Sequence, residues 1–370
     1  MGWRIDEIEG DWLGGSRFAL ASHETLVEDF NRVEKILGRE WIFASRVSPW
    51  GNIVRGLGPT LRVATMGKKL TVLEGINGGL DRLVGRILHG DLSAEAELTA
   101  IYLLRSQSPT AKVELYPRVG ERESDFRIAQ DEKPWTYVEV AQPDASEAEK
   151  QARAILERIA ELVKKIKKPF ALEVFLRREP SEQELLAAIQ VIPGLCNLEG
   201  AHQQELPNGL GILFLNHSGP GQILLQDHPG EEHRPRIALA TTTAGGDEPH
   251  RHIAVRMAFA DDRAGAFLTV ESRQLPTDAP GLIMFQMGRA SGGMKAWEPL
   301  LRRRFQPALH TRVSAVCLSS GGLWPTPKGE AWLPQTKLLI NPHARLALAP
   351  WIADALKQAG AEYEQLVGSS

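Results

Sequence analysis

The feature that most constrains this chain is a pair of short strand-like segments joined by a polar turn. Residues 123–128 and 136–141 alternate apolar and polar side chains, and residues 130–134 form the turn between them. A hairpin that pairs the two apolar faces places Asp125 beside Glu139 on one side of a sheet. Neighbouring carboxylates repel each other unless a cation lies between them, and a divalent metal is the usual one. The hairpin therefore predicts a metal site; the alternative is two ordinary acids on the exposed face of an antiparallel sheet.

The segments that flank the hairpin predict a helix and a strand before it, and a helix and a strand after it. Apolar residues at helical spacing predict a helix over residues 93–105, and Glu97 falls inside its apolar stripe, where a carboxylate needs a partner. Residues 111–116 alternate as a strand. After the hairpin, a capping box at residues 144–147 opens a second helix, and residues 170–176 form a buried strand. The predicted fold class is mixed α/β, with the order αβββαβ.

This order, with an acidic residue in the first helix, an Asp entering the second strand and a Glu in the third, resembles the core of the PD-(D/E)XK nuclease superfamily, the restriction-endonuclease-like fold. The resemblance covers about residues 91–178. Asp125 matches the Asp of the family motif, although Ser124 replaces the preceding Pro, and Glu139 matches the acidic residue of the second half. Glu97 matches the helix carboxylate that some members add to the metal shell. The resemblance implies that Mg²⁺ or Mn²⁺ is held by these three carboxylates.

The family motif ends in a Lys, but Ala141 stands at that position in this chain. In a site of this kind the metal polarises the phosphate and lowers the pKa of a bound water, while the Lys orients the water and stabilises developing negative charge. Lys150, early in the following helix, is the expected replacement as a catalytic residue, and Lys112 on the preceding strand is the second candidate. The backbone carbonyl of Val140 is expected to offer the metal a further oxygen ligand.

Composition excludes some classes of protein. The chain has 370 residues, 43% of them hydrophobic, which suits a globular protein of two or three domains. A formal net charge of −3 argues against a polycationic nucleic-acid binder, so any contact with nucleic acid requires a local basic patch. Cys196 and Cys317 form neither a disulfide framework nor a metal cluster. Without a signal peptide or a membrane-length apolar run, we expect a cytoplasmic protein with no membrane association.

Breaks in the pattern predict three regions along the chain. Residues 1–90 form a mainly helical N-terminal region, residues 91–195 the nuclease-like core, and residues 196–370 a C-terminal α/β domain. Within the last region, the apolar runs 281–287 and 312–318 are expected to be buried, neighbouring strands of a sheet separate from the hairpin.

Three functions are compatible with the sequence. The first is a Mg²⁺-dependent endonuclease with weak activity on the phosphodiester bonds of DNA or RNA. The second is a nuclease-like fold that has lost catalysis and serves as a nucleic-acid-binding or assembly module. The third is an unrelated α/β protein in which Asp125 and Glu139 are surface residues. The missing Lys at position 141 favours the second over the first, whereas Glu97 on an apolar face favours a retained metal site.

Overall fold

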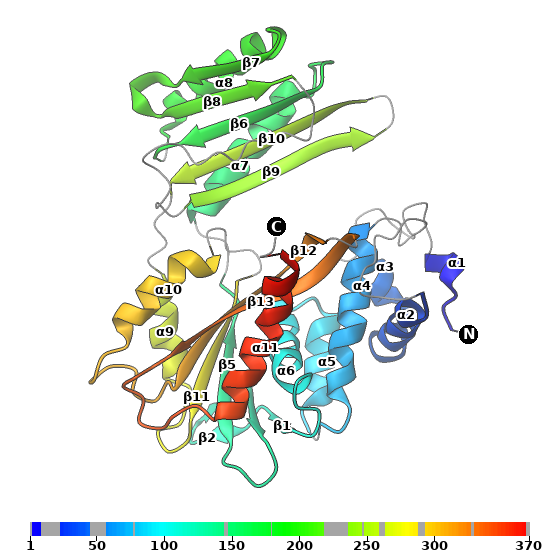
Figure 1. Ribbon diagram of the computed structural model, residues 1–370, viewed down its shortest axis with the longest axis vertical. Helices are drawn as coiled ribbons and strands as arrows, with labels where there is room; N and C mark the ends of the chain where they lie inside the picture. Colours follow the sequence, from blue (N-terminus) through cyan, green and yellow to red (C-terminus); the bar gives the residue numbers. More distant parts are fainter. Residues whose placement is uncertain are drawn as a thin grey trace. The chain divides into compact units, whose positions relative to one another are not determined.

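One chain forms two compact units in the computed structural model (Figure 1). The first unit comprises Met1–Pro143, Arg263–Gly288 and Leu300–Ser370, and the second comprises Asp144–Asp262 and Arg289–Pro299. In sequence, therefore, the second unit is inserted into the first. The structure describes residues 2–8, 23–44, 57–76, 78–143, 147–178, 180–217, 236–245, 248–258, 263–287, 293–326 and 329–367.

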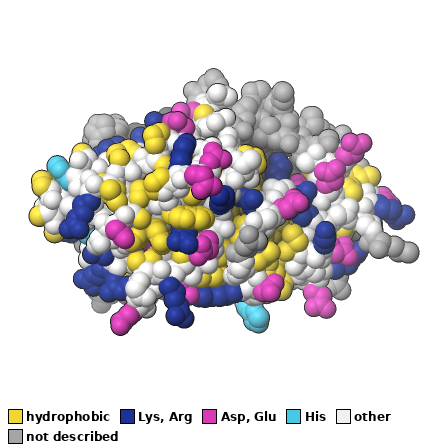
Figure 2. All heavy atoms as spheres, turned by 90° about the horizontal axis from the view of Figure 1, so that it is seen from below, with side chains coloured by type: hydrophobic (Ala, Val, Ile, Leu, Met, Phe, Trp, Pro, Cys, Tyr) yellow, Lys and Arg dark blue, Asp and Glu magenta, His cyan; other side chains and the backbone are white. Residues whose placement is uncertain are grey.

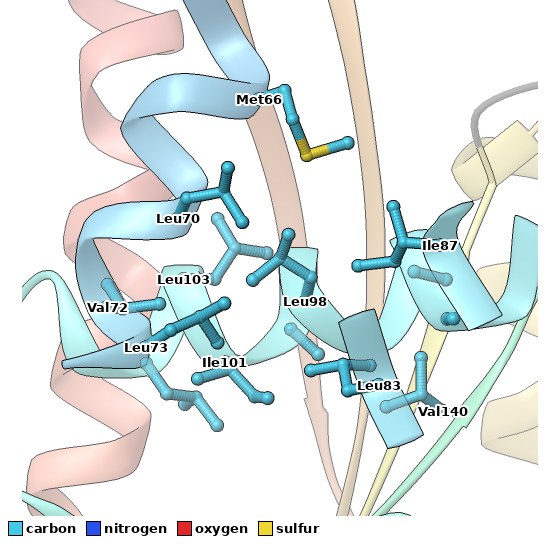
Figure 3. Packing of buried hydrophobic residues seen from close by; sticks show 14 of the residues in the cluster. Met66, Leu70, Val72, Leu73, Leu83, Ile87, Leu98, Ile101, Leu103 and Val140 are labelled. Atoms are coloured by element: carbon cyan, nitrogen blue, oxygen red, sulfur yellow. The ribbon is translucent and has the colours of Figure 1, made fainter. Parts of the chain in front are cut away.

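Helices make up the described chain before the first strand. The side chain of Asp91 caps the N-terminus of helix α6 by accepting a hydrogen bond from the N–H of Ser93 (2.9 Å). Apolar side chains of these helices belong to one buried cluster with the strands of the first unit, part of which is shown in Figure 3. Residues 1–90 thus have no separate core. The helices are α1 (Ile5–Ile8), α2 (His23–Leu37), α3 (Arg39–Phe43), α4 (Leu57–Leu70), the 3-10 helix η1 (Thr71–Leu73), α5 (Leu80–Leu88) and α6 (Leu92–Arg105).

The first unit contains a six-stranded mixed sheet with the order β1-β4-β5-β11-β12-β13. The central strand β5 is antiparallel to β4 and parallel to β11, and β11 is parallel to β12. The strands are β1 (Lys112–Leu115), β4 (Phe126–Ala129), β5 (Thr136–Ala141), β11 (Gly281–Gln286), β12 (Ala315–Thr326) and β13 (Gly329–Ile340), with a small separate hairpin of β2 (Arg118–Val119) and β3 (Arg122–Glu123). The later helices are α9 (Ala264–Ser272) and α11 (Pro350–Val367), together with α10 (Gly293–Arg304), which is divided between the two units at Leu300.

The two faces of strand β5 are covered by different helices. Val138 and Val140 point to one face and join the buried cluster that includes α6 (Figure 3). Glu139 lies between them in sequence and so points to the other face. On that face, Phe267 of α9 packs edge-to-face against Phe285 of β11, with ring centroids 6.3 Å apart. Helices α6 and α9 therefore lie on opposite sides of the sheet.

The expected boundary near residue 195 is wrong. Strands β11 and β12 are buried neighbours, as predicted from residues 281–287 and 312–318. However, β11 also pairs with β5, so both strands continue the sheet of the hairpin and do not form one of their own. Between β5 and β11 in sequence lie residues 144–262 of the second unit, and no local break in the sequence pattern reveals such a pairing.

The second unit has its own five-stranded sheet, with the order β7-β8-β6-β10-β9. Helices α7 and α8 pack with this sheet around a second apolar cluster. Among the described residues of the whole chain, no helix has both the length and the apolar composition that crossing a membrane requires. The elements are α7 (Glu147–Val163), β6 (Phe170–Leu176), α8 (Glu182–Asn197), β7 (Ala201–Glu205), the 3-10 helix η2 (Pro207–Gly209), β8 (Gly211–Asn216), β9 (Arg236–Gly245) and β10 (Glu248–Ala258).

The buried strand predicted at residues 170–176 is present as β6, but it belongs to the second sheet. It pairs with β10 and β8, so it does not end the sequence of elements that begins with α6. The helix predicted to precede it is α7, which is also part of the second unit. The first residues of the predicted capping box, 144–146, lie outside the described residues.

Candidate functional site

Asp125 lies immediately before strand β4, opposite Glu139 of β5. The antiparallel register pairs Phe126 with Val138, so Asp125, one residue before Phe126, faces Glu139, one residue after Val138. The N–H of Val140 donates a hydrogen bond to Oδ2 of Asp125 (2.7 Å). The Asp125 side chain therefore continues the hydrogen bonding of the hairpin where the backbone ladder ends. This bond fixes the position of the carboxylate at the sheet.

Glu139 is buried, and its carboxyl group lacks a full set of hydrogen-bond partners among the described residues. The residue is 1% exposed, and its Oε1 atom has no hydrogen-bond partner in the described part of the chain. Burial, and then the charge of Asp125, raise the pKa of Glu139 to about 9. The Ser124 hydroxyl is near enough to lower that pKa, although its Oγ has no hydrogen-bond partner among the described residues. Glu139 thus holds a proton at neutral pH unless a cation stabilises its charge.

Glu97 of α6 is equally buried, at 2% exposed, but it has strong partners. The guanidinium of Arg86 contacts both of its oxygens, at 2.8 and 3.0 Å, and the hydroxyl of Tyr116 donates to Oε2 at 3.1 Å. Burial and the charge of Asp125 raise the pKa of Glu97 to about 7, although Arg86 opposes the shift. Glu97 therefore lies near Asp125 and is already paired with a cationic side chain.

Tyr116 is held in place from several sides. Its backbone has a φ of 54°, a conformation that costs a residue with a side chain about 1 kcal/mol or more. The guanidinium of Arg82 lies over its ring, 4.0 Å from the centroid, and forms an ion pair with Glu123 at 2.6 Å. Arg86 donates to its hydroxyl at 3.2 Å. No sequence pattern predicts the roles of Arg82, Arg86 and Tyr116, because these roles depend on tertiary contacts.

Glu271 of α9 is a fourth acid of this group, and sequence analysis missed it. Burial, and then the charge of Asp125, raise the pKa of Glu271 to about 7, and Glu271 in turn raises the pKa of Glu139. Its Oε2 accepts a hydrogen bond from Gln274 (3.0 Å). The pKa of Asp125 itself is raised to about 6, chiefly by burial. The pairing of β11 with β5 brings α9 to the hairpin.

The other expected site residues are placed differently. Lys150 lies on α7 in the second unit, where it forms an exposed ion pair with Glu147 at 2.7 Å, so its catalytic role stays a prediction. Lys112 pairs with Glu132 at 3.3 Å on the exposed side of β1. The Val140 side chain packs in the apolar cluster (Figure 3), and the metal contact of its carbonyl also stays a prediction.

The chemistry of the acids suits a hard divalent cation, although the shell is incomplete as the side chains lie. Among the described residues, no three Asp, Glu, His or Cys side chains form a ready metal-binding group. Mg²⁺ commonly keeps several waters and uses one or two protein carboxylates together with substrate phosphates. Asp125 and Glu139, with the unpartnered Oε1, provide such a donor set. No known family model, curated protein or solved structure matches this chain.

Proposed function

We propose that the protein is a divalent-cation-dependent phosphodiesterase of the nuclease type, acting on DNA or RNA at Asp125 and Glu139. The observation that carries this proposal is the buried Oε1 of Glu139, which has no hydrogen-bond partner among the described residues and lies opposite Asp125. Burying an acid beside a second acid is unfavourable for both. A cation between them removes the repulsion and supplies the missing partner, so the arrangement favours cation binding.

The order of elements in the first unit supports the same proposal. Apart from the small separate hairpin β2–β3, helix α6, strands β1, β4 and β5, helix α9 and strand β11 follow one another as αβββαβ, with residues 144–262 of the second unit inserted after β5. This is the order on which the resemblance to PD-(D/E)XK nucleases rests, with α9 and β11 in place of the expected α7 and β6. Asp125 enters the second strand and Glu139 lies in the third, as that resemblance requires.

The residues of the chain have distinct tasks in this site. A bound Mg²⁺ or Mn²⁺ supplies polarisation of the phosphate and a water of lowered pKa. Asp125 keeps its orientation through the N–H of Val140, so little rotamer freedom is lost on binding. Glu139 holds a proton when it is alone and gives it up when a cation approaches. Ala141 has no amine to orient water, so we expect slow turnover.

Loss of catalysis is the second candidate, and the surroundings of position 141 favour it. Ala141 is 9% exposed and lies opposite Phe285 in the sheet register, so a larger side chain has little room there. Lys150, the expected replacement, belongs to the other unit. In this case the fold binds a cation and nucleic acid without cleaving the phosphodiester bond.

We expect electrostatic attraction to contribute little to the binding of a polyanion. Figure 2 shows a face of the molecule on which Lys and Arg side chains are interspersed with Asp and Glu. Together with the net charge of −3, this mixture predicts few phosphate contacts and a shallow dependence of affinity on salt. Short or single-stranded substrates are therefore better first probes than long duplexes.

Cleavage of labelled DNA and RNA oligonucleotides in Mg²⁺ or Mn²⁺ tests the proposal. We expect weak cleavage by the wild type, none by Asp125→Asn or Glu139→Gln, and unchanged cleavage by the exposed control Glu132→Gln. Ala141→Lys sharpens the test, with circular dichroism to verify folding. A gain in rate supports the nuclease. Mn²⁺ binding without cleavage by either the wild type or folded Ala141→Lys supports the binding module instead.

A further inference from the structure

We infer that Glu271 of helix α9 is a third protein ligand of the cation at Asp125 and Glu139, so that the chain completes its site only after the inserted second unit. The inference rests on the proposed cation site, and it replaces Glu97 by Glu271 as the third ligand. The sequence resemblance predicts Glu97 of α6 as the third ligand. Strand alternation directs the Glu139 side chain, with its unpartnered oxygen, to the face of the sheet on which Phe267 of α9 packs.

The register of the sheet fixes the face to which Glu139 points. Glu139 pairs with Ile283, and Ala141 pairs with Phe285, in the parallel ladder between β5 and β11. Side chains that pair across a sheet point to the same face. Phe285 contacts Phe267 of α9. Glu139 therefore points toward the α9 side.

The geometry of α9 then brings Glu271 to Glu139. Glu271 follows Phe267 by four residues, which places the two side chains on the same face of the helix, about 6 Å apart along its axis. On β11, Ile283 is paired with Glu139 and lies two residues before Phe285, which is a distance of about 6.6 Å along the strand. A helix that leads directly into a parallel strand runs antiparallel to it, so the two steps go in the same direction.

A hydrogen bond independently ties the end of α9 to the segment that carries Asp125. Arg122 of β3 donates from its Nη1 to the backbone carbonyl of Arg273. Arg273 lies two residues after Glu271, and Arg122 lies three residues before Asp125. The charges agree with a position of Glu271 near both acids, because Asp125 raises the pKa of Glu271 and Glu271 raises that of Glu139. Glu97 shows the same two couplings, so the contacts of the two side chains decide between them.

Glu97 is less suited to the third position. Its carboxylate is held by Arg86 and Tyr116 on the α6 side of the sheet, so a cation has to displace the guanidinium to bind there. Glu271 is only half-buried and its described hydrogen bond is to the neutral amide of Gln274. Since the acids as they lie do not form a ready metal-binding group, binding requires the Glu271 side chain to change rotamer.

Mn²⁺ titration of the full chain, followed by electron paramagnetic resonance, tests the inference. We expect Glu271→Gln to weaken Mn²⁺ binding at least about tenfold, since even outer-shell partners of metal ligands have effects of that size. Glu271→Asp keeps the charge and is expected to recover part of the affinity. Glu97→Gln and the exposed control Glu132→Gln are expected to bind within about threefold of the wild type.

The outcomes separate this inference from the proposed function. Wild-type affinity in folded Glu271→Gln overturns the role of Glu271 and leaves the site at Asp125 and Glu139 in place. Weakening by Glu97→Gln with no effect of Glu271→Gln also overturns it and restores the assignment from sequence. Absence of Mn²⁺ binding by the wild type itself overturns both the proposed function and this inference.

Discussion

Glu97 of helix α6 and Glu139 of strand β5 are two buried acids of the same unit, and they differ in how their charge is compensated. Both are almost fully buried, at 2% and 1% exposed. Glu97 receives hydrogen bonds from Arg86 and Tyr116, whereas one oxygen of Glu139 has no partner in the described chain. Burial alone therefore does not identify a functional acid. The informative feature is a buried acid for which the described residues supply no positive charge.

The second unit provides a further compensated example. Glu173 of β6 is 5% exposed and forms a buried ion pair with Arg256 of β10, which is 4% exposed. An acid in the interior of that sheet is thus matched by an arginine. Glu139 departs from this pattern, and it does so beside Asp125 and Glu271, which add to its negative surroundings.

The largest expected effect comes from breaking the compensated region. Arg86→Met removes the cation that pairs with Glu97 and leaves the buried carboxylate without its charge partner. Removing one member of a buried pair costs about 3 kcal/mol or more of unfolding free energy. Urea denaturation measures this loss. The matched control is Arg82→Met, since the Arg82 side chain is 52% exposed and its loss should cost much less. Equal losses in the two variants would contradict the central role of Arg86.

A smaller effect of opposite sign is expected in the uncompensated region. At pH 7, Glu139→Gln is expected to raise the unfolding free energy of the metal-free protein by about 1 to 3 kcal/mol. Glu139 has to be protonated in the folded state at a pH where a carboxyl group is ordinarily ionised, and a neutral Gln avoids this cost. Glu132→Gln is the control with little expected change. Destabilisation by Glu139→Gln would show that the carboxyl group is better satisfied than its contacts indicate.

The pH dependence follows from the same raised pKa. Between about pH 4.5 and pH 9, Glu139 is protonated in the folded state and ionised in the unfolded state, so the folded state binds more protons. Stability is therefore fully present below pH 4.5 and falls as pH rises toward 9. The raised pKa values of Asp125 and Glu271 also make stability fall with rising pH, up to about pH 6 for Asp125 and about pH 7 for Glu271. Urea denaturation at pH 5.5, 7 and 8.5 should show a shallower fall in Glu139→Gln, and identical slopes would refute the assignment.

The smallest expected effect is that of Lys150→Ala. Lys150 and Glu147 are both well exposed, so the variant should change the unfolding free energy by less than about 0.5 kcal/mol. Its Mn²⁺ affinity should equal that of the wild type. A fall in turnover at unchanged affinity would support the water-activating role expected from the sequence, since such a group acts on the transition state. Unchanged turnover would remove Lys150 from the site.

Local patterns in the sequence predicted the elements that depend on neighbouring residues. Helix α6 was expected at residues 93–105 and spans Leu92–Arg105, and β5 was expected at residues 136–141 and spans Thr136–Ala141. Both elements follow from the periodicity of their own apolar side chains. The pairing of Asp125 with Glu139 also follows locally, because a short hairpin fixes its own register.

Contacts between distant segments could not be predicted in this way. Three features depend on residues more than 100 positions apart. They are the return of the chain from the second unit, the parallel pairing of β11 with β5, and the position of Glu271. Arg86 illustrates the same limit, since on the sequence alone it is one of many charged residues. Its role arises only when α5, α6 and the loop at Tyr116 pack together.

Isothermal titration of Mn²⁺ into the wild type and Glu139→Gln tests the central claim most directly, which is that Glu139 needs a cation. We predict saturable binding by the wild type at pH 7.5, with release of protons because Glu139 ionises on binding, and at least about tenfold weaker binding by Glu139→Gln. Proton release is measured by repeating the titration in buffers of different ionisation enthalpy. No binding by the folded wild type, or equal binding by the two proteins, would contradict the account.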